Sequence, residues 1–472
     1  MSTKLNKIIK QLIYSFSANG ILMIFSIVSV LFFPKILGLK EYGIWQLYLF
    51  YFSFCGFLPL GWLDGIYLRY GGRIFSKLNG NLLSLQFVIF IFFTFVELIS
   101  IDIVSKYFIE DKDKLFAIDY LLITLSIYIP FSYLKNLLQL SGEISKFAKL
   151  IFVDRLIFMI SAIIFILYVK NITNEFMIAD IIAKFVVGIL AIRYCISIIK
   201  SFNIKYWRQI WKDIISNIYV GYSLMLSNIA SLLVFGIIRF GISQEWNIIT
   251  FGKISLTFSI CNFLIVFINS ASIVLFPIIK NISLETIKKT YSSFNFVLTV
   301  FLLSCLFIYY PLKEVLLIWL PKYADSLIYM AILFPICVFE SKMALLISTY
   351  LKALRKEKVL LKINIISLIF SIILTFFSAY IFHILDLTVF CIILIIAFRN
   401  VMAELCMNFI LKINTVKDIV LELVIITIFI GCNYFITGYI SILIYLIIFI
   451  FYLIYEKNHI KFSYQFIKTY IK

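Results

Sequence analysis

The sequence predicts an all-α polytopic membrane protein of about fourteen transmembrane helices, arranged as two pseudo-symmetric six-helix bundles and a C-terminal helix pair. Composition, the length of the apolar runs and a weak internal repeat support this prediction. Hydrophobic residues make up 63% of the 472 residues and charged residues 14%, and the mean hydropathy is +1.07. Soluble chains are about 45–50% apolar and about 25% charged. This composition therefore excludes a soluble enzyme, a secreted disulfide scaffold and a disordered chain.

A helix needs about 20 apolar residues to cross a hydrocarbon core about 30 Å thick. Because backbone groups in lipid must bond within their own segment, and these runs are too long for barrel strands, we expect helices. Pro130 and Pro335 fall inside the fourth and tenth spans, where bends would suit a rocking transporter. The predicted spans are 11–33, 43–68, 81–101, 115–137, 150–169, 176–199, 216–240, 247–272, 291–310, 326–350, 360–382, 387–411, 419–437 and 439–455.

Two short similarities indicate that the chain contains a repeat. The turn Gly38–Ile44 is similar to the turn Gly241–Ile248, and the exit of the fourth span, YLKNLLQLSGEISKFAKL, is echoed by ISTYLKALRKEKVLLKI at the exit of the tenth. Repeated halves are typical of secondary transporters. The predicted parts are an N-terminal bundle at 1–212, a second bundle at 213–414, and a helix pair with a cytoplasmic tail at 415–472.

The distribution of charge predicts the orientation. The chain has 42 Lys and Arg against 24 Asp and Glu, a formal net charge of +18. With the N-terminus inside, cytoplasmic segments hold about 27 basic residues and external loops about 8, as the positive-inside rule requires. Both termini are therefore expected in the cytoplasm. The basic residues are scattered between apolar runs and form no basic domain, so no nucleic-acid partner is expected.

No site for a metal, a cofactor or bond-making catalysis is visible in the sequence. The eight cysteines lie in or beside apolar segments without a C-x-x-C spacing, and His383 and His459 are too far apart in sequence for a zinc site. No hydrophilic stretch outside the spans exceeds about 20 residues. This absence argues against a membrane glycosyltransferase or polysaccharide polymerase, which usually has a large external loop. The protein is predicted not to be an enzyme.

The N-terminal run SANGILMIFSIVSVLFFPKILGLKEYGIWQLYLFY, followed by GWLDGIYLRYGG, resembles the polysaccharide transporter family of bacterial flippases. The family's Leu-Gly-x-x-x-Tyr-Gly turn is matched at Leu37–Gly43, and its Gly-x-x-x-x-Arg-Tyr element at Gly65–Tyr70. A later element looks like LLIWLPKYADS at Leu316–Ser326, although Pro321 stands near a position where the family usually has glycine. Multidrug-and-toxin exporters and the peptidoglycan-precursor flippase belong to the same superfamily.

The resemblance implies an O-antigen or capsule repeat-unit flippase of the bacterial inner membrane. Its substrate would be an undecaprenyl-diphosphate-linked oligosaccharide, moved from the cytoplasmic to the periplasmic leaflet by alternating access. Membrane lipids, a polysaccharide polymerase and a chain-length regulator are the implied partners. A cation-coupled drug or metabolite exporter is the first alternative, but the first span has no carboxylate between Gln11 and Phe33. The peptidoglycan-precursor flippase would have arginine in that helix, and this chain has none there.

Ionisable residues near the middle of a membrane span are costly and by default indicate a functional pathway. Glu340 and Lys342 lie near the centre of the tenth span, and Arg399 lies near the centre of the twelfth. Two residues apart on a helix, Glu340 and Lys342 point in different directions, so they are not expected to pair with each other. These three residues are candidates for the substrate path, with structural pairing between helices as the alternative.

Three further candidates lie nearer the membrane surfaces. Lys253, about one and a half turns into the eighth span, could meet a diphosphate or snorkel to the interface. Asp64 and Arg69 lie at the cytoplasmic end of the second span, after a segment interrupted by Pro59 and two glycines. The fixed donor fork of arginine suits a phosphate, and anchoring on anionic lipid is the alternative.

The remaining charges in the spans are expected to be structural or solvated. Asp180 and Lys184 are spaced i, i+4 and should neutralise each other on one helix face. Glu404 is expected near the inner surface, in water. The charged residues close to span ends, which should also reach water, are Glu97, Arg155 and Arg193.

Overall fold

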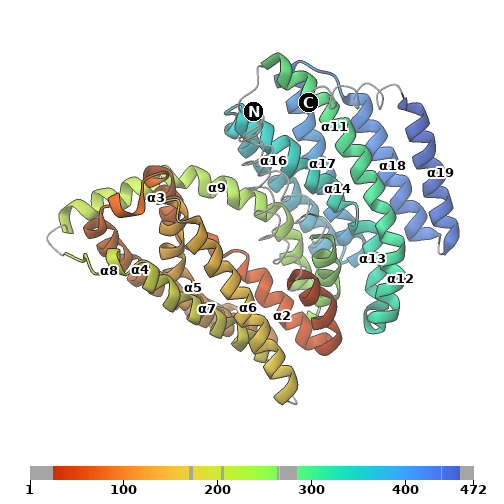
Figure 1. The fold of residues 1–472 in the computed structure, drawn as a ribbon. Coiled ribbons are helices and arrows are strands. Elements are labelled where there is room, and N and C mark those ends of the chain that lie inside the picture. The colour runs from red at the N-terminus through yellow and green to blue at the C-terminus, as the bar shows by residue number, and fades with distance from the viewer. Residues whose placement is uncertain are drawn as a thin grey trace. The chain divides into compact units, whose positions relative to one another are not determined.

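The computed structural model describes residues 25–169, 174–203, 207–262, 265, 284–436 and 438–457, and these residues form helices joined by turns, without a strand (Figure 1). They fall into two compact units. The N-terminal unit contains residues 32–232 and 248–252, and the C-terminal unit contains the described residues up to 31, residues 233–247 and those from 253 onward. The lysines predicted to be cytoplasmic before residue 25 and after residue 457 lie outside the described residues.

The N-terminal unit is organised around one central helix. This helix, α5, contacts α2, α3, α4, α6 and α7, and α6 packs along α7. The helices of this unit are α2 (Leu39–Phe52), α3 (Trp62–Tyr70), α4 (Gly80–Phe108), α5 (Lys112–Leu140), α6 (Ile144–Tyr168), α7 (Glu175–Tyr194), α8 (Ile196–Ile199) and α9 (Trp207–Glu245) as far as Leu232.

Aromatic rings from α2, α6, α7 and the short helix Phe25–Ile36 fill part of the core of the N-terminal unit. Trp45 of α2 stacks on Phe158 of α6 with ring centroids 5.7 Å apart. Phe33 meets Phe176 of α7 edge-on at 4.4 Å. Edge-to-face and offset-stacked pairs add stability beyond the area they bury, so this cluster fixes α2 against α6 and α7.

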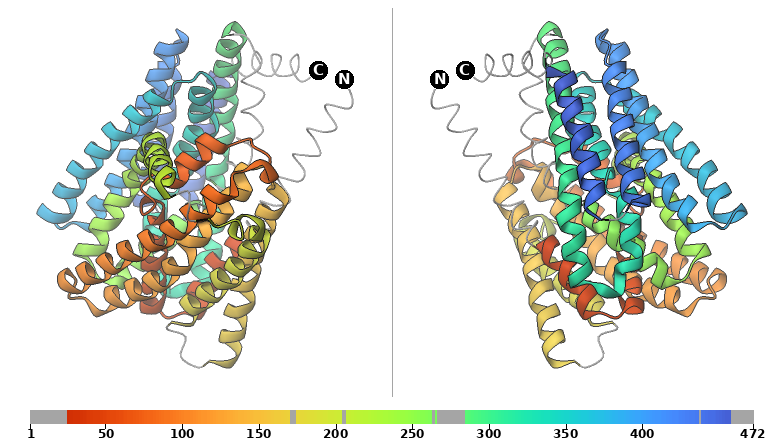
Figure 2. Two further views of the ribbon diagram at one scale, coloured as in Figure 1. Left: turned by 90° about the vertical axis from the view of Figure 1, so that its left-hand side faces the viewer. Right: turned by 90° about the vertical axis from the view of Figure 1, so that its right-hand side faces the viewer.

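In the C-terminal unit, α17 contacts α13, α14 and α16, while α18 packs against α13 and α19. Figure 2 shows α18 and α19 as neighbouring blue helices. The helices are the end of α9, the part of the apolar helix Ile248–Asn262 that begins at Lys253, α11 (Leu284–Cys305), α12 (Tyr309–Trp319), α13 (Ala324–Leu333), α14 (Ile336–Lys342), α15 (Ser348–Ala353), α16 (Glu357–Thr375), α17 (Leu385–Leu411), α18 (Val416–Phe435) and α19 (Tyr439–Tyr455).

The predicted all-helical membrane fold is confirmed. Within the described residues, eight helices are long and apolar enough to cross a membrane, or ten if each of two bent pairs is one span. Three shorter apolar helices cover Phe25–Ile36, Ile248–Asn262 and Tyr439–Tyr455. The total of fourteen spans and the division at residues 212 and 414 stay predictions.

Two spans are broken where the sequence contains proline. Leu39–Phe57 and Trp62–Tyr70 meet at 54°, on either side of Pro59. Gly61 turns the chain there with φ = 80°, a conformation that costs glycine little. Pro321–Leu333 and Ile336–Ala353 meet at 43°, on either side of Pro335. By contrast, α5 continues unbroken through Pro130. Of the two bends that the sequence predicts, at Pro130 and Pro335, the structure therefore has the one at Pro335.

Helices α3 and α9 approach each other closely within the N-terminal unit. A Cβ atom added to Gly65 would lie 1.8 Å from the carbonyl oxygen of Asn217, and one added to Gly221 would lie 2.0 Å from the carbonyl oxygen of Gly61. Small residues allow such backbone contact between membrane helices. The glycines therefore bring the polar side chains of α3 next to those of α9.

We expect Gly65→Ala to lower the midpoint of thermal unfolding in detergent, because the new methyl group must push α3 away from α9. Overpacking of this kind typically costs about 1–3 kcal/mol. Gly56→Ala is the matched control, since a Cβ there meets no atom within 4 Å. Equal unfolding midpoints for the two variants would show that the close approach does not stabilise the fold.

Candidate functional site

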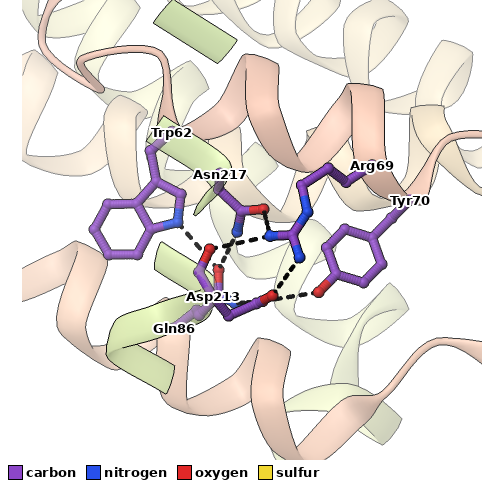
Figure 3. A network of polar contacts seen from close by, with 6 residues as sticks. All are labelled: Trp62, Arg69, Tyr70, Gln86, Asp213 and Asn217. Carbon is purple, nitrogen blue, oxygen red and sulfur yellow. Dashed lines mark hydrogen bonds and ion pairs between the residues drawn. The ribbon is translucent and has the colours of Figure 1, made fainter. Parts of the chain in front are cut away.

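A network of polar side chains joins α3, α4 and α9 in the N-terminal unit (Figure 3). The Arg69 network consists of Trp62, Arg69, Tyr70, Gln86, Asp213 and Asn217. Its centre is the carboxylate of Asp213, which lies 2.7 Å from Arg69 Nη2 and accepts hydrogen bonds from Tyr70 at 2.8 Å and Gln86 at 2.6 Å. Arg69 also donates to the backbone oxygen of Asp213 and to the side chain of Asn217. The predicted phosphate-binding arginine therefore has a carboxylate partner.

Gln86 completes the network from α4. Its side-chain oxygen accepts hydrogen bonds from Trp62 and Asn217, each at 3.1 Å. The side chain of Arg69 is 30% exposed and that of Asp213 is 12% exposed, so one side of the guanidinium remains accessible. Asp64, the other candidate on α3, is half-buried and takes no part in the network. The structure thus does not join the two candidates of the second span.

A second charge cluster connects α6 and α7. The ammonium of Lys184 lies 2.8 Å from Asp154 and 3.3 Å from Asp180, and all three residues are buried. The hydroxyl of Tyr48 lies 2.7 Å from Asp180. The predicted pairing of Asp180 with Lys184 is confirmed, and Asp154 is a further partner from a different helix.

Lys135, near the end of α5, lies beside this cluster. Its ammonium is 5.2 Å from the centre of the Tyr128 ring, and Lys184 lies 5.7 Å from the same ring. The side chain is half-buried, and in the described part of the chain no carboxylate lies within ion-pair distance of it. Lys184 already has two carboxylate partners, whereas Lys135 has none among the described residues. Lys135 is therefore the ammonium of this cluster that is a candidate contact for a phosphate.

In the C-terminal unit, the two candidates Arg399 and Glu340 form an ion pair between α17 and α14. The guanidinium of Arg399 also lies 5.2 Å from the ring centre of Phe235. Arg399 is 2% exposed. As predicted, Glu340 does not pair with Lys342. The structure therefore brings two of the six candidates together.

Lys342 makes a separate cluster, which we call the Lys342 triad, with Glu404 of α17 and Glu422 of α18. Its ammonium lies 2.7 Å from Glu404, which also accepts a hydrogen bond from Asn400 at 2.9 Å. The side chains of Lys342, Glu404 and Glu422 are 0%, 1% and 2% exposed. The expectation that Glu404 lies in water is wrong, because α14 and α18 cover it.

Lys253 stands apart from the other candidates. Its ammonium lies 3.3 Å from Asp325, whose side chain is 88% exposed. Exposed ion pairs contribute little, so Lys253 can exchange this partner for another anion. Among the residues expected to reach water, Arg155 and Arg193 are exposed and Glu97 is half-buried.

Sequence reasoning missed four functional candidates. Asp154 and Glu422 both lie inside predicted spans, so the criterion used for Glu340 identifies them as well. Asp213 lies just before a predicted span and Gln86 is uncharged. The criterion of a charge inside a span therefore identifies neither residue. Within the described residues, no group of His, Cys, Asp and Glu could hold a metal ion.

In comparisons by sequence, no protein-family model and no curated protein matches the chain. Solved structures do share its fold. The lipid II flippase MurJ in an inward closed conformation is 16% identical, with a TM-score of 0.63 over 94% of this chain and 98% of that one. An inward-facing multidrug resistance MATE family transporter of the MOP superfamily is 14% identical, with a TM-score of 0.61 over 84% and 96%.

A Vibrio cholerae MATE transporter is also similar, at 14% identity and a TM-score of 0.53 over 87% of this chain and 97% of that one. The chain therefore has the fold of MOP superfamily transporters, a group that includes drug exporters and a flippase. These neighbours are membrane transporters and not enzymes.

Proposed function

We propose that the protein is a flippase that moves undecaprenyl-diphosphate-linked oligosaccharide repeat units from the cytoplasmic to the periplasmic leaflet by alternating access. The observation that carries the proposal is the match to a lipid II flippase along 94% of the chain. The resemblance of residues 17–51 to the polysaccharide transporter family adds to it. The proposed location is the bacterial inner membrane, with both termini cytoplasmic. O-antigen or capsule units are the proposed cargo.

The extent of the match favours a flippase over a drug exporter of the same fold. The MATE structure covers 84% of this chain and the flippase covers 94%. We propose that the additional 10% of the chain is the C-terminal helix pair α18–α19 (Val416–Tyr455). A C-terminal helix pair beyond twelve spans is the arrangement that the sequence predicts.

The charges of both units suit a diphosphate head group. In the N-terminal unit, Lys135 lacks an ion-pair carboxylate within the described residues, and Arg69 is partly accessible beside Asp213. In the C-terminal unit, Lys253 has an exposed partner that it can exchange. We propose that these three cations contact the diphosphate in turn, and that the path also includes Asp64, Glu340, Lys342 and Arg399. Moving a lipid head group needs no nucleophile, base or metal.

Deleting the gene should leave synthesis of the repeat unit intact while the surface polysaccharide disappears, because the polymerase acts on units that have crossed the membrane. The lipid-linked unit should accumulate on the cytoplasmic leaflet, as measured by its inaccessibility to periplasmic enzymes, and a plasmid copy should restore the polysaccharide. If single units reach the periplasm without being joined, the protein is a polymerase. If the polysaccharide is unchanged and export of cationic drugs is lost, it is an exporter.

A further inference from the structure

The charges of the Lys342 triad do not balance. Two carboxylates, Glu404 and Glu422, share the single ammonium of Lys342, and all three side chains are at most 2% exposed. The adjacent pair Arg399–Glu340 is neutral by itself. The buried group therefore carries one net negative charge when every carboxylate is ionised.

Oxygen atoms without a donor surround this excess charge. Oε2 of Glu404 and Oε1 of Glu422 are buried and accept no hydrogen bond within the described residues. Tyr291 of α11, which is 0% exposed, has a buried hydroxyl that also lacks a hydrogen-bond partner there. The two glutamates are among its strongest charged neighbours. Three helices, α11, α17 and α18, thus each contribute a buried oxygen atom that lacks a hydrogen-bond partner within the described residues.

An uncompensated charge in such a site is expensive, because burial removes the water that would solvate it. A proton removes the net charge and also supplies an O–H donor for one of the unsatisfied oxygen atoms. A metal cation would instead have to bind beside the ammonium of Lys342, 2.7 Å from Glu404, and would be repelled by it. The chemistry of the site therefore favours a proton.

Within the described residues, the other titratable groups around the Lys342 triad do not supply the missing charge. Asp418 lies one turn from Glu422 on α18, and Tyr350 of α15 packs edge-on against Tyr291 with ring centroids 5.1 Å apart. Tyr452 of α19 has Asp418 and Glu422 as charged neighbours. These groups are acidic or neutral, so they strengthen the demand for a positive charge.

We propose that Glu404 and Glu422 together hold one exchangeable proton, which neutralises the Lys342 triad. The site stands on this charge count and does not depend on the proposed function. Lys342 ends α14 and is followed directly by a π-helical turn at Met343–Ile347. The bend at Pro335 precedes α14. Loss of the proton would thus place a net charge next to α14, which is preceded by the bend at Pro335 and followed by the π-helical turn.

The proton makes stability depend on pH in a defined direction. The folded protein binds one proton more than the unfolded chain, in which both glutamates ionise above about pH 4.3. Stability must therefore fall as the pH rises, by up to about tenfold in the unfolding equilibrium constant per pH unit. Glu422→Gln and Glu404→Gln each remove one negative charge and keep the shape, so each should abolish this component of the pH dependence.

The experiment measures thermal unfolding of the purified protein in detergent between about pH 5 and pH 9. The wild type should lose stability with rising pH, while the two glutamine variants should show a flatter profile and higher stability at the alkaline end. Asp102→Asn, which changes an exposed pair with Lys106, is the control and should follow the wild type. A slope shared by the wild type and both glutamine variants would overturn the proposal.

Infrared difference spectra provide a second measurement that does not depend on unfolding. The spectrum of the wild type minus that of Glu422→Gln should show the carbonyl band of a protonated carboxylic acid at neutral pH. This band should shift in deuterated water. Lys342→Met should be rescued by adding Glu404→Gln and Glu422→Gln, which together leave the site uncharged. Absence of the band, or failure of this rescue, contradicts the charge count.

Discussion

Replacing Arg399 with methionine is expected to lower the free energy of unfolding by about 3–5 kcal/mol, because Glu340 is then left in a buried place without its cation. The side chain of Glu340 is 17% exposed and that of Arg399 is 2% exposed, so water can screen little of this charge. Adding Glu340→Gln should recover most of the loss, since replacing both members of a buried pair is often neutral. Thermal unfolding in detergent measures both effects.

The same double variant separates a structural role of the pair from a role in the substrate path. If Arg399 and Glu340 line the path, the variant should fold but move substrate at least about tenfold more slowly, a loss of about 1.4 kcal/mol in the transition state. The exposed residues Arg155 and Arg193, changed to methionine, are the controls and should retain transport. A well-folded double variant with wild-type transport would assign the pair to structure alone.

Lys135→Ala should reduce transport of the lipid-linked unit by about tenfold or more, because the diphosphate loses a charge-assisted contact that contributes about 1.5–3 kcal/mol. Lys135→Arg keeps the charge and should retain most of the activity. Folding should change little in either variant, since Lys135 has an aromatic ring beside it and, within the described residues, no ion pair. Initial rates in reconstituted vesicles provide the measurement.

Lys106→Ala is the matched control for Lys135. Lys106 is also on a long helix of the N-terminal unit, but its side chain is 58% exposed and pairs with Asp102 four residues earlier. An equal loss of transport in the Lys106 and Lys135 variants would mean that overall charge matters and that Lys135 is not a specific contact.

The sequence predicts the helices well because a helix in lipid satisfies its own backbone, so each apolar run contains the information for its own structure. The run around residues 81–101 becomes α4, for example, and the break at Pro59 becomes a bend of 54°. The i, i+4 pair Asp180–Lys184 is equally local, and the spacing alone predicts it.

Partners on distant helices could not be predicted in this way. Arg69 pairs with Asp213, and Lys342 pairs with Glu404 and Glu422, through packing that brings together segments far apart in the chain. Glu404 lies toward the end of its predicted span, yet it is 1% exposed, so the distance to the end of a span does not give the distance to water. In fact, neighbouring helices bury a side chain wherever they pack, including near the end of a helix.

The most direct test of the account is transbilayer movement of the proposed cargo by the purified protein. Vesicles should carry undecaprenyl-diphosphate-linked oligosaccharide, and a glycan-cleaving enzyme added outside should report the accessible fraction. The account predicts that the full-length protein lets the enzyme reach nearly all of the lipid, while vesicles without protein stop at the outer leaflet. If the accessible fraction is the same with and without the protein, while a cationic drug crosses only when it is present, the flippase proposal is wrong.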